Sequence, residues 1–410
     1  MSKQTFVIVG ASLAGAKAAQ ELHEHGFDGR VVLIGAETER PYERPPLTKD
    51  YLRGESEREK AYVHAPDYYG QHDIELMTDT TVTAIDPGAS RVTLDDGSEL
   101  SYDRLLLTTG SEPRRITAPG SELDGIYYMR SLADCDALRR RLDDSGRVAV
   151  VGAGWIGSEF AASARQLGLE VTVIDPLALP NERIFGAEIG GFYRDVHVRH
   201  GVEMLLGQGV EAFEGDGAVA RVRTSAGKVV ECDFAVVGIG IAPRTGLAAD
   251  AGLAVNDGIV TNARLETSAP GVFAAGDVAS AWHPFYDQQL RVEHWANALN
   301  QGPAAARAML GEDVSYERIP YFFSDQYEVG MEYSGYATSW DQVVFRGERD
   351  GGEFVAFWLS DGRVVGGMNV NVWDVNQHVQ ELIRSRRAVD VAALTDPDTP
   401  LDGLVSETTA

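Results

Sequence analysis

The sequence predicts an α/β fold with two Rossmann-like dinucleotide-binding domains and a small α+β domain at the C-terminal end. The first observation behind this prediction is a pattern that occurs twice, near residues 10 and 152: an apolar run, a glycine-rich turn and a helix of small residues. The second is that short alternating runs follow each copy of the pattern. The third is a separate block, after residue 320, in which strand-like runs precede one helical segment.

The first copy of the pattern begins with Phe6–Val9, an apolar run of strand length. Ala14–His25 then has a helical pattern, and Arg30–Ile34 is a second apolar run. This order predicts a strand, a helix and a strand. The runs that follow are short and separated by turn signals, which predicts a β-meander that leads into another strand. These runs are Thr81–Ile85, Arg91–Leu94 and Leu100–Thr108.

The second copy repeats the order of the first. Val148–Val151 is the apolar run, Ile156–Leu167 the helical segment, and Val171–Ile174 the second run, which ends at Asp175. Alternating runs follow again, so the sequence predicts an internal duplication of a strand–helix–strand unit and a meander. These runs extend from Val210 through Arg221–Thr224 and Val229–Gly238.

The third block begins near Tyr321 and ends in a helical pattern over Val375–Ser385, with a loose tail expected from Asp396 on. Its strand-like runs are Gln342–Arg346, Phe354–Leu359 and Val364–Met368. We expect the first nucleotide-binding domain to be split around the second. The expected domains are 1–110 with 244–320, then 111–243, then 321–410.

Composition excludes several classes of function. The formal net charge of −26 disfavours binding to nucleic acid or to an anionic membrane surface. No apolar run reaches the roughly 18–20 residues of a membrane helix, and Phe6–Ala19 lacks the features of a signal peptide. We therefore expect a cytoplasmic protein. Cys135 and Cys232 are far apart and form no C-x-x-C motif, which disfavours a redox-active dithiol.

The first glycine-rich turn is a candidate site for a pyrophosphate, because such turns bring backbone N–H groups to a phosphate at the start of a helix. Its middle position is Ser12 rather than glycine, which weakens the motif; a tight turn without a ligand is the alternative. Glu37 lies near the place where an acid usually binds a ribose. The candidate contacts of the turn are Gly10, Ser12, Leu13, Ala14 and Gly15.

The second turn has all three glycines, and Asp175 ends the following strand at the expected distance. A carboxylate there accepts hydrogen bonds from ribose hydroxyls and repels a 2′-phosphate. Since the nearest arginine is Arg183, the sequence favours NAD(H) over NADP(H). Two turns imply two nucleotides, and so a protein that passes electrons between two cofactors. The candidate contacts of this turn are Gly152, Gly154, Trp155, Ile156 and Gly157.

Three further features have weaker meanings. Gly276-Asp277 follows a strand-like run and suits a polyol hydroxyl and a phosphate, although a loop aspartate that caps a helix is the alternative. His197 and His200 share a helix-like segment, and we interpret them as solvated helix residues rather than metal ligands. We interpret the arginine clusters 139–141 and 384–387 as charges at helix C-termini, where they complement the helix dipole. Docking of an acidic partner is the alternative.

Over nearly its whole length the chain resembles the FAD-dependent NADH:ferredoxin reductases of oxygenase systems, of the putidaredoxin reductase and biphenyl dioxygenase type, within the two-dinucleotide-fold flavoprotein superfamily. The most specific of the matching motifs is the Arg44-Pro-Pro-Leu-Thr-Lys49 box, which ends the matching stretch Pro41–Lys49. The others occur in family order. They are Thr108–Arg114, Arg130-Ser131, Gly152–Glu159, Gly238–Pro243, Gly276-Asp277, Arg291–Ala298 and Pro320–Tyr327.

The resemblance implies two cofactors, FAD and NAD, and assigns residues to each. Lys49 would lie near the flavin and pair with Glu159, and both would act in catalysis. Glu159 and Gly240 would also belong to the NAD site. The further FAD contacts that it implies are Arg44, Val82, Thr109, Gly110, Arg130, Gly276, Asp277, Glu293, His294, Trp295 and Phe323.

The sequence departs from the family at Thr48, where serine is usual, at Ala36, where an acid is common, and at Phe323, where tryptophan is frequent. The resemblance implies electron transfer from NADH through FAD to a 2Fe–2S ferredoxin by a transient, weak complex. Two alternatives stay open: a rubredoxin reductase, and a signalling or scaffold flavoprotein that resembles apoptosis-inducing factor.

Overall fold

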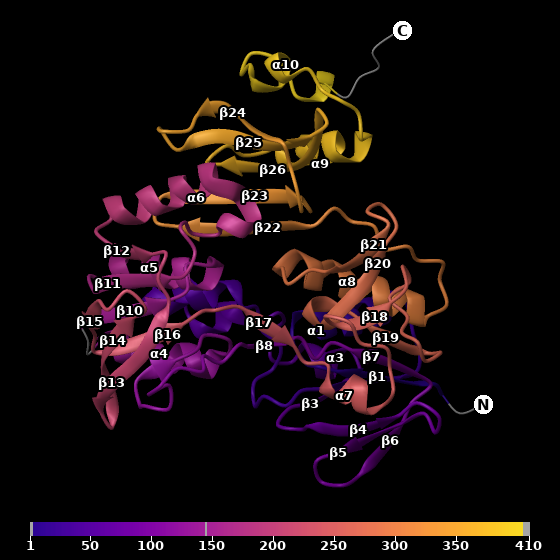
Figure 1. Cartoon of the computed structure of the whole chain (residues 1–410). Helices are drawn as coiled ribbons and strands as arrows, with labels where there is room; N and C mark the ends of the chain where they lie inside the picture. Colours follow the sequence, from indigo (N-terminus) through magenta and orange to yellow (C-terminus); the bar gives the residue numbers. More distant parts are fainter. Residues whose placement is uncertain (1–2, 144–145, 405–410) are drawn as a thin grey trace. The chain divides into compact units, whose positions relative to one another are not determined.

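The computed structural model describes residues 3–143 and 146–404, and they form two compact units (Figure 1). The first unit comprises Met1–Pro45, Glu57–Glu112 and Ile241–Arg318. The second comprises Pro46–Ser56, Pro113–Gly240 and Ile319–Ala410. Helix η1 (Pro45–Thr48) lies where the chain first leaves the first unit, and β8 (Ser111–Pro113) and β17 (Ile241–Pro243) lie where it leaves and re-enters it.

A parallel five-stranded sheet organises the first unit, with the strand order β19-β7-β1-β2-β3. Apolar side chains point to both faces of this sheet, as expected when helices or further strands cover each side. Phe6 and Ile8 pack on one face against helices, whereas Val7 and Val9 pack on the other against the meander. The strands are β1 (Thr5–Val9), β2 (Arg30–Ile34), β3 (Ile74–Met77), β7 (Arg104–Leu107) and β19 (Val272–Ala274).

Helices α1 (Leu13–Glu24) and α8 (Trp295–Met309) pack side by side over one face. Gly302 permits their close contact, because a Cβ there would lie 2.2 Å from the carbonyl oxygen of Ala14. The remaining elements of this unit are short. They are η2 (Arg58–Ala61), α3 (Tyr68–Gln71), β4 (Val82–Asp86), β5 (Arg91–Leu94), β6 (Glu99–Ser101), α7 (Gly246–Asp250), β18 (Ile259–Thr261), η3 (Gly276–Val278), β20 (Ala279–His283) and β21 (Gln288–Arg291).

The expected run Leu100–Thr108 is not one strand. It divides into β6, which belongs to the meander, and β7, which belongs to the parallel sheet. The break lies at Tyr102-Asp103, where the Asp103 carboxylate accepts a hydrogen bond of 2.7 Å from the backbone N–H of Thr5. This bond ties the corner to the start of β1.

The second unit contains a parallel sheet with the same kind of topology, in the order β12-β11-β10-β16-β9. Helix α5 (Trp155–Gln166) follows β10 directly, as α1 follows β1, so the duplication predicted from the sequence is present. The other elements of this part are α2 (Asp50–Arg53), β9 (Ile126–Tyr127), α4 (Leu132–Asp143), β10 (Arg147–Val151), β11 (Glu170–Asp175), α6 (Glu182–Arg199), β12 (Glu203–Leu206), β13 (Val210–Asp216), β14 (Ala218–Thr224), β15 (Val229–Glu231) and β16 (Phe234–Val237).

An antiparallel sheet, in the order β22-β23-β26-β25-β24, forms the C-terminal part of the second unit. Helix α6 covers one of its faces, and the indole of Trp358 donates a 3.0 Å hydrogen bond to the carbonyl of Phe185. Strands β22 and β23 were not predicted individually. The elements are β22 (Tyr321–Gln326), β23 (Val329–Gly335), β24 (Gln342–Glu348), β25 (Glu353–Ser360), β26 (Arg363–Val370), α9 (Asn376–Ser385), α10 (Val391–Thr395) and η4 (Asp402–Leu404).

The loose tail expected from Asp396 is wrong for residues 396–404, and residues 405–410 lie outside the described part. The Arg346 guanidinium donates to the carbonyls of Asp396, Pro397 and Thr399 at 2.7, 3.0 and 2.8 Å. Five N–H donors on one side chain allow this multiple contact. A single arginine from β24 therefore fixes the segment.

The interpretation of His197 as a solvated residue is also wrong. His197 lies on the buried face of α6 and is 0% exposed. Its ring nitrogens contact the side chains of Gln326 and Tyr327 from β22 and the following turn. The arginine clusters lie at helix ends as expected: Arg140 and Arg141 in the last turn of α4, and Arg384 in that of α9.

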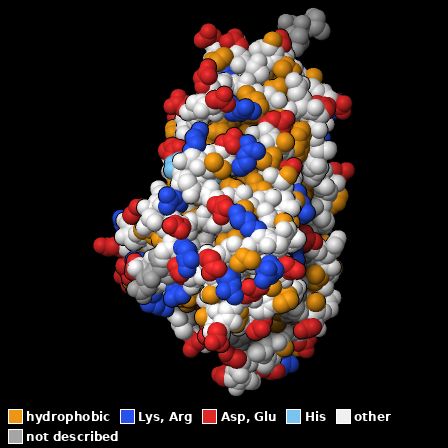
Figure 2. Space-filling view, turned by 60° about the vertical axis from the view of Figure 1, so that its left-hand side comes forward, with side chains coloured by type: hydrophobic (Ala, Val, Ile, Leu, Met, Phe, Trp, Pro, Cys, Tyr) orange, Lys and Arg blue, Asp and Glu red, His pale blue; other side chains and the backbone are white. Residues whose placement is uncertain are grey.

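The surface carries both signs of charge despite the net value of −26. On the face that Figure 2 shows, Lys and Arg side chains are interspersed with Asp and Glu. No helix of the described residues has the length and apolar character that a bilayer crossing requires.

Burial lowers the pKa of His197 to about 4, from 6.5 when unfolded. Between these pH values the unfolded chain takes up a proton at His197 that the folded chain does not. We therefore expect the free energy of unfolding to fall as pH drops from 6.5 toward 4, with about 2 kcal/mol of the loss between pH 7 and 5 due to this residue. His197→Gln, which cannot titrate, should lose less stability over that interval.

Urea unfolding of both proteins at pH 7 and pH 5 measures this difference. His64 and His294 also have pKa values lowered to about 4 by burial. They contribute equally to both proteins, so the comparison isolates His197. An equal loss of stability in the variant and the unmodified protein contradicts the assignment.

Candidate functional site

The first glycine-rich turn, between β1 and α1, is shaped by backbone contacts that no larger residue permits. Gly10 has φ of +119°, and a Cβ there would lie 2.2 Å from the carbonyl oxygen of Thr108 at the end of β7. A Cβ on Gly15 would lie 2.2 Å from the carbonyl oxygen of Gly10. The turn thus places the first N–H groups of α1 at the carboxyl edge of the parallel sheet, where open α/β sheets bind ligands.

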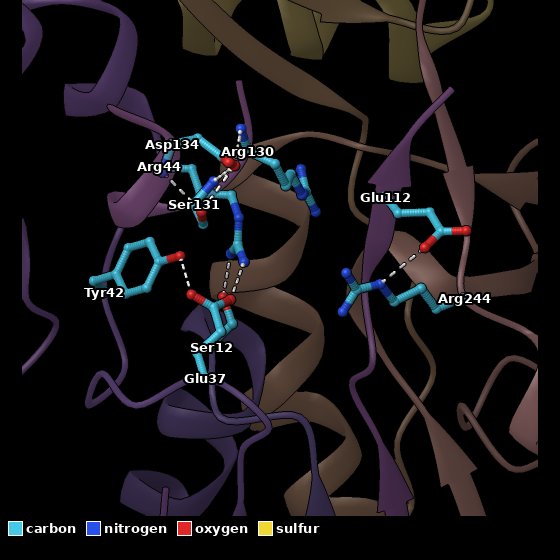
Figure 3. A network of polar contacts seen from close by, with 9 residues as sticks. All are labelled: Ser12, Glu37, Tyr42, Arg44, Glu112, Arg130, Ser131, Asp134 and Arg244. Atoms are coloured by element: carbon cyan, nitrogen blue, oxygen red, sulfur yellow. Dashed lines mark hydrogen bonds and ion pairs between the residues drawn. The ribbon is translucent and has the colours of Figure 1, made fainter. Parts of the chain in front are cut away.

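Ser12, the departure from the motif, has a partner of its own. Figure 3 shows the Arg44 guanidinium directed at this turn, with Nη1 donating to the Ser12 hydroxyl. Arg44 Nη2 lies 3.6 Å from Glu37 Oε1, and the Tyr42 hydroxyl donates to Glu37 Oε2 at 2.5 Å. These contacts hold a cation at the start of α1 and an acid beside it, which suits a pyrophosphate and a ribose.

The ends of two other strands complete this edge of the sheet. At the end of β19, Gly276 (φ +79°) donates its N–H to Gln301 Oε1 of α8 at 2.9 Å, and a Cβ there would lie 3.2 Å from that of Ala14. Asp277 follows in η3.

At the end of β7, the Thr109 hydroxyl donates to the carbonyl of Arg244 at 3.0 Å. The predicted contact Gly110 has φ of +65° and accepts a backbone hydrogen bond of 2.9 Å from Arg244. Figure 3 also draws the nearby pair of Arg244 with Glu112.

The predicted residues 293–295 lie at the start of α8. His294 is the N-cap residue, and burial lowers its pKa to about 4, so that its imidazole is neutral at pH 7. Glu293 pairs with Arg291. Burial raises the pKa of Glu43, which hydrogen-bonds with Trp295. Val82 differs from these residues, because its side chain is buried in the apolar cluster and leaves only its backbone for a ligand.

The second glycine-rich turn, between β10 and α5, repeats the first. A Cβ on Gly152 (φ +104°) would lie 2.3 Å from the carbonyl oxygen of Gly238, and one on Gly157 would lie 2.0 Å from that of Gly152. Gly154 differs, because nothing lies within 4 Å of the position its Cβ would take. Two glycines are therefore required by packing, whereas the third leaves open space at the helix start. This open space fits the close approach of a pyrophosphate.

Asp175 ends β11 with its carboxylate fixed beside this turn. Oδ2 accepts the N–H of Ala153 at 2.6 Å, and Oδ1 accepts that of Leu177 at 2.7 Å. Arg183, by contrast, is exposed on the first turn of α6. Gly240, with φ of +98°, follows β16. Of the predicted NAD contacts, the glycine turn, Asp175 and Gly240 thus lie at the carboxyl edge of the second parallel sheet, whereas Arg183 lies apart on α6.

The structure brings Lys49 and Glu159 together within the second unit. Lys49 Nζ lies 2.6 Å from Glu159 Oε2, and the two side chains are 13% and 9% exposed. The Thr48 hydroxyl donates to the same oxygen at 2.6 Å, and the Ser324 hydroxyl donates to Oε1 at 2.7 Å. The ammonium also lies 5.5 Å from the centre of the Phe323 ring. A buried carboxylate with three donors is a stable charge rather than an isolated one.

Arg130 is the remaining predicted contact. The backbone N–H groups of Arg130 and Ser131 donate to the Asp134 carboxylate at 3.2 and 2.8 Å, which fixes this loop at the start of α4 (Figure 3). The predicted FAD contacts therefore fall in both units, with Lys49, Arg130 and Phe323 in the second. Among the described residues, no group of three or more His, Cys, Asp and Glu side chains could hold a metal ion.

Sequence reasoning missed Ser324, Gln301 and Tyr42 as members of these sites. Ser324 and Tyr42 belong to motifs that carry the resemblance. Ser324 directly follows Phe323 in β22, so the side chains of these two residues point to opposite faces of the strand. Gln301 is buried on the apolar face of α8. A glutamine at an apolar position of a helical pattern is the signal by which the sequence could have revealed it.

Comparison with known proteins agrees with this geometry. Residues 4–302 match the family described as pyridine nucleotide-disulphide oxidoreductase, and residues 321–405 match the reductase C-terminal family. The crystal structure of the covalent putidaredoxin reductase–putidaredoxin complex contains a chain similar to this one with a TM-score of 0.94, at 35% identity and 99% coverage of each chain.

Two relatives are similar over almost their whole length. The anthranilate 1,2-dioxygenase system ferredoxin–NAD(+) reductase component of Burkholderia cepacia is 38% identical, over 99% of this chain and 98% of that protein. The 5,5′-dehydrodivanillate O-demethylase ferredoxin reductase subunit of a Sphingobium species is 36% identical, over 98% of each. The chain therefore belongs to the pyridine nucleotide-disulphide oxidoreductase family and, within it, to the ferredoxin reductases of oxygenase systems.

Proposed function

We propose that this protein is an FAD-dependent NADH:ferredoxin oxidoreductase, which passes electrons from NADH to a 2Fe–2S ferredoxin that serves an oxygenase. The observation that carries the proposal is the pair of glycine turns, each pressed against a neighbouring strand end and each at the start of a helix. The names of the relatives support the ferredoxin and the oxygenase, and favour this function over a rubredoxin reductase or a signalling flavoprotein.

The first turn would hold the FAD pyrophosphate, with Arg44 as its cation and Glu37 as the ribose acceptor. Gly276-Asp277 and the strand end at Thr109 would extend this site. When bound, FAD accepts the two electrons that NADH delivers together and releases them one at a time, as a one-electron carrier requires. Because His294 at the start of α8 is neutral, it adds no positive charge to the positive end of that helix.

The second turn would hold NADH, with Asp175 as the ribose acceptor. Lys49 would supply positive charge near the reacting rings. Its partner Glu159 offsets the desolvation of the ammonium, and Thr48 and Ser324 hold that carboxylate in one orientation. These side chains orient and balance charge; none of them is required as a nucleophile.

We also propose the domain division 1–110 with 244–320 for FAD, 111–243 for NADH and 321–410 as the C-terminal domain. The strand composition of the two parallel sheets supports it. A cytoplasmic location is proposed because NADH is produced there and neither of the two cysteines forms a disulfide. Arg384, Arg386 and Arg387, at the end of α9, are candidates for docking an acidic ferredoxin.

The direct test of the function is the identity of the cofactor and of the carrier. Denaturation of the purified protein should release non-covalently bound FAD, and NADH should drive reduction of a 2Fe–2S ferredoxin faster than that of a rubredoxin. Release of FMN, or equal turnover with both carriers, contradicts the proposal.

Asp175→Asn should narrow the preference for NADH over NADPH by roughly tenfold, because about 1.4 kcal/mol of differential interaction gives that change. The ratio of kcat/KM for the two nucleotides measures it. Glu170→Gln, at the exposed start of the same strand, removes an equal charge and should leave the ratio unchanged. Since Asp175 also accepts two backbone N–H groups, thermal unfolding must accompany the kinetics. A preference that is as strong in Asp175→Asn as in the unmodified protein opposes the ribose role.

Lys49→Met should slow flavin reduction by NADH, by roughly 2–4 kcal/mol in the barrier, more than it weakens FAD retention. It should also destabilise the fold, because Glu159 stays buried without its cation. Stopped-flow absorbance measures the first effect and urea unfolding the second. Lys60→Met, at an exposed position, is the control. The double variant Lys49→Met/Glu159→Gln should recover stability to urea without recovering the rate of flavin reduction. If Lys49→Met reduces the flavin as fast as the unmodified protein, Lys49 does not belong to the site.

A further inference from the structure

We propose that His197 is a positioning residue of the reductase: it fixes the Glu159 carboxylate, and thereby Lys49, through two intervening side chains. This inference deepens the proposed function and rests on the role given there to the Lys49–Glu159 pair. We call the four residues His197, Gln326, Ser324 and Glu159 the His197–Glu159 link.

The link is a continuous row of hydrogen bonds inside the second unit. His197 Nε2 lies 2.9 Å from Gln326 Oε1, Gln326 Nε2 lies 3.2 Å from Ser324 Oγ, and Ser324 Oγ lies 2.7 Å from Glu159 Oε1. All four residues are buried, and the exposed fraction of the whole residue is 0%, 1%, 1% and 7% in the same order. It therefore connects α6, β22 and α5 through the protein interior.

The chemistry of the groups allows only one direction of donation along the link. A carboxylate only accepts, so the Ser324 hydroxyl donates to Glu159 and its oxygen accepts from the Gln326 amide. The Gln326 carbonyl then accepts from His197, which must carry its proton on Nε2. His197 Nδ1, without a proton, accepts from the Tyr327 hydroxyl at 3.2 Å. Every donor in the row points toward Glu159.

This arrangement positions the carboxylate rather than conducting protons. A glutamine amide cannot pass a proton on and keep its form, and the burial that lowers the pKa of His197 to about 4 keeps the ring neutral. The link instead fixes the orientation of Glu159. Its Oε1 is held by Ser324, which leaves Oε2 for Lys49 and Thr48.

The consequence for catalysis follows from the geometry. Without the N–H that His197 donates, the Gln326 amide would no longer be fixed, and the Ser324 hydroxyl and the Glu159 carboxylate would be free to rotate. Lys49 would then move with Glu159, its partner in the ion pair. A displacement near 1 Å of a catalytic group lowers a rate by up to about a hundredfold. His197 thus acts on Glu159 along one face of β22, since Ser324 and Gln326 are two residues apart on that strand.

The first experiment observes the link itself in the holoenzyme. The ¹³Cδ2 chemical shift of His197 should report the Nε2–H tautomer at pH 7. The carboxylate ¹³C resonance of Glu159, assigned by its loss in Glu159→Gln, should move in His197→Phe and return toward its original position in His197→Gln, which keeps an N–H donor. An Nδ1–H tautomer, or a Glu159 resonance unmoved by His197→Phe, overturns the proposal.

The second experiment measures stopped-flow reduction of the flavin by NADH. His197→Phe should lower the limiting rate by about tenfold with little change in the apparent KM for NADH, and His197→Gln should recover most of it. A limiting rate in His197→Phe equal to that of the unmodified protein overturns the positioning role. If Lys49→Met leaves the rate unchanged while the Glu159 resonance still responds to His197, the proposed role of Lys49 fails and the link stands.

One control variant and one further variant of the link separate positioning from general destabilisation. His283→Phe removes another buried histidine, whose Nε2 donates to the carbonyl of Arg318 at 3.0 Å in the first unit. It should leave the Glu159 resonance and the limiting rate unchanged. Gln326→Met interrupts the link at its middle and serves if His197→Phe does not fold. The double variant His197→Phe/Gln326→Met should lower the limiting rate little more than either single change does. Additive effects of the two changes on the rate indicate independent roles and contradict a single link.

Discussion

In both parallel sheets the chain passes from strand to helix through a glycine that lies against the end of a neighbouring strand. The missing Cβ of Gly10 would overlap the carbonyl of Thr108, and that of Gly152 would overlap the carbonyl of Gly238. These contacts fix the start of each helix at the carboxyl edge of its sheet, and with it the direction of the free N–H groups. Asp175, at a strand end on the second edge, accepts the N–H of Ala153 in the second turn, and Gly276, which precedes Asp277, lies close to Ala14 after the first turn.

The two turns solve the same steric problem with different chemistry. The middle position of the second turn is Gly154, which leaves open space, whereas that of the first is Ser12, whose hydroxyl binds Arg44. A serine therefore need not weaken a phosphate site when a neighbouring cation uses its hydroxyl. Under the proposed function, Arg44 offsets the weaker motif at Ser12 through a contact between positions 12 and 44, which no local pattern contains.

What could be predicted from the sequence was local, and what could not was long-range. The strand–glycine–helix order predicted both turns, because their conformations are encoded by adjacent residues. The burial of His197 could not be predicted from α6 alone, since it depends on Gln326 and Tyr327 far along the chain. The same holds for Arg346, which orders the segment after Asp396 through contacts with its carbonyls. The Lys49–Glu159 contact was expected only through the family resemblance, while Ser324, which donates to the other oxygen of Glu159, was not expected at all.

The family takes its name from disulphide chemistry, yet the two cysteines of this chain argue against that chemistry here. Cys135 and Cys232 are 0% and 2% exposed, and neither forms a disulfide. The thiol of Cys135 donates to the carbonyl of Leu47, and burial raises the pKa of Cys232 to about 12. Since the thiolate is the reactive form, neither residue is activated for exchange. The proposed electron transfer accordingly uses bound nucleotides rather than cysteines, and in that proposal the polar groups of the protein, from Arg44 to the His197–Glu159 link, act by holding charge and orientation.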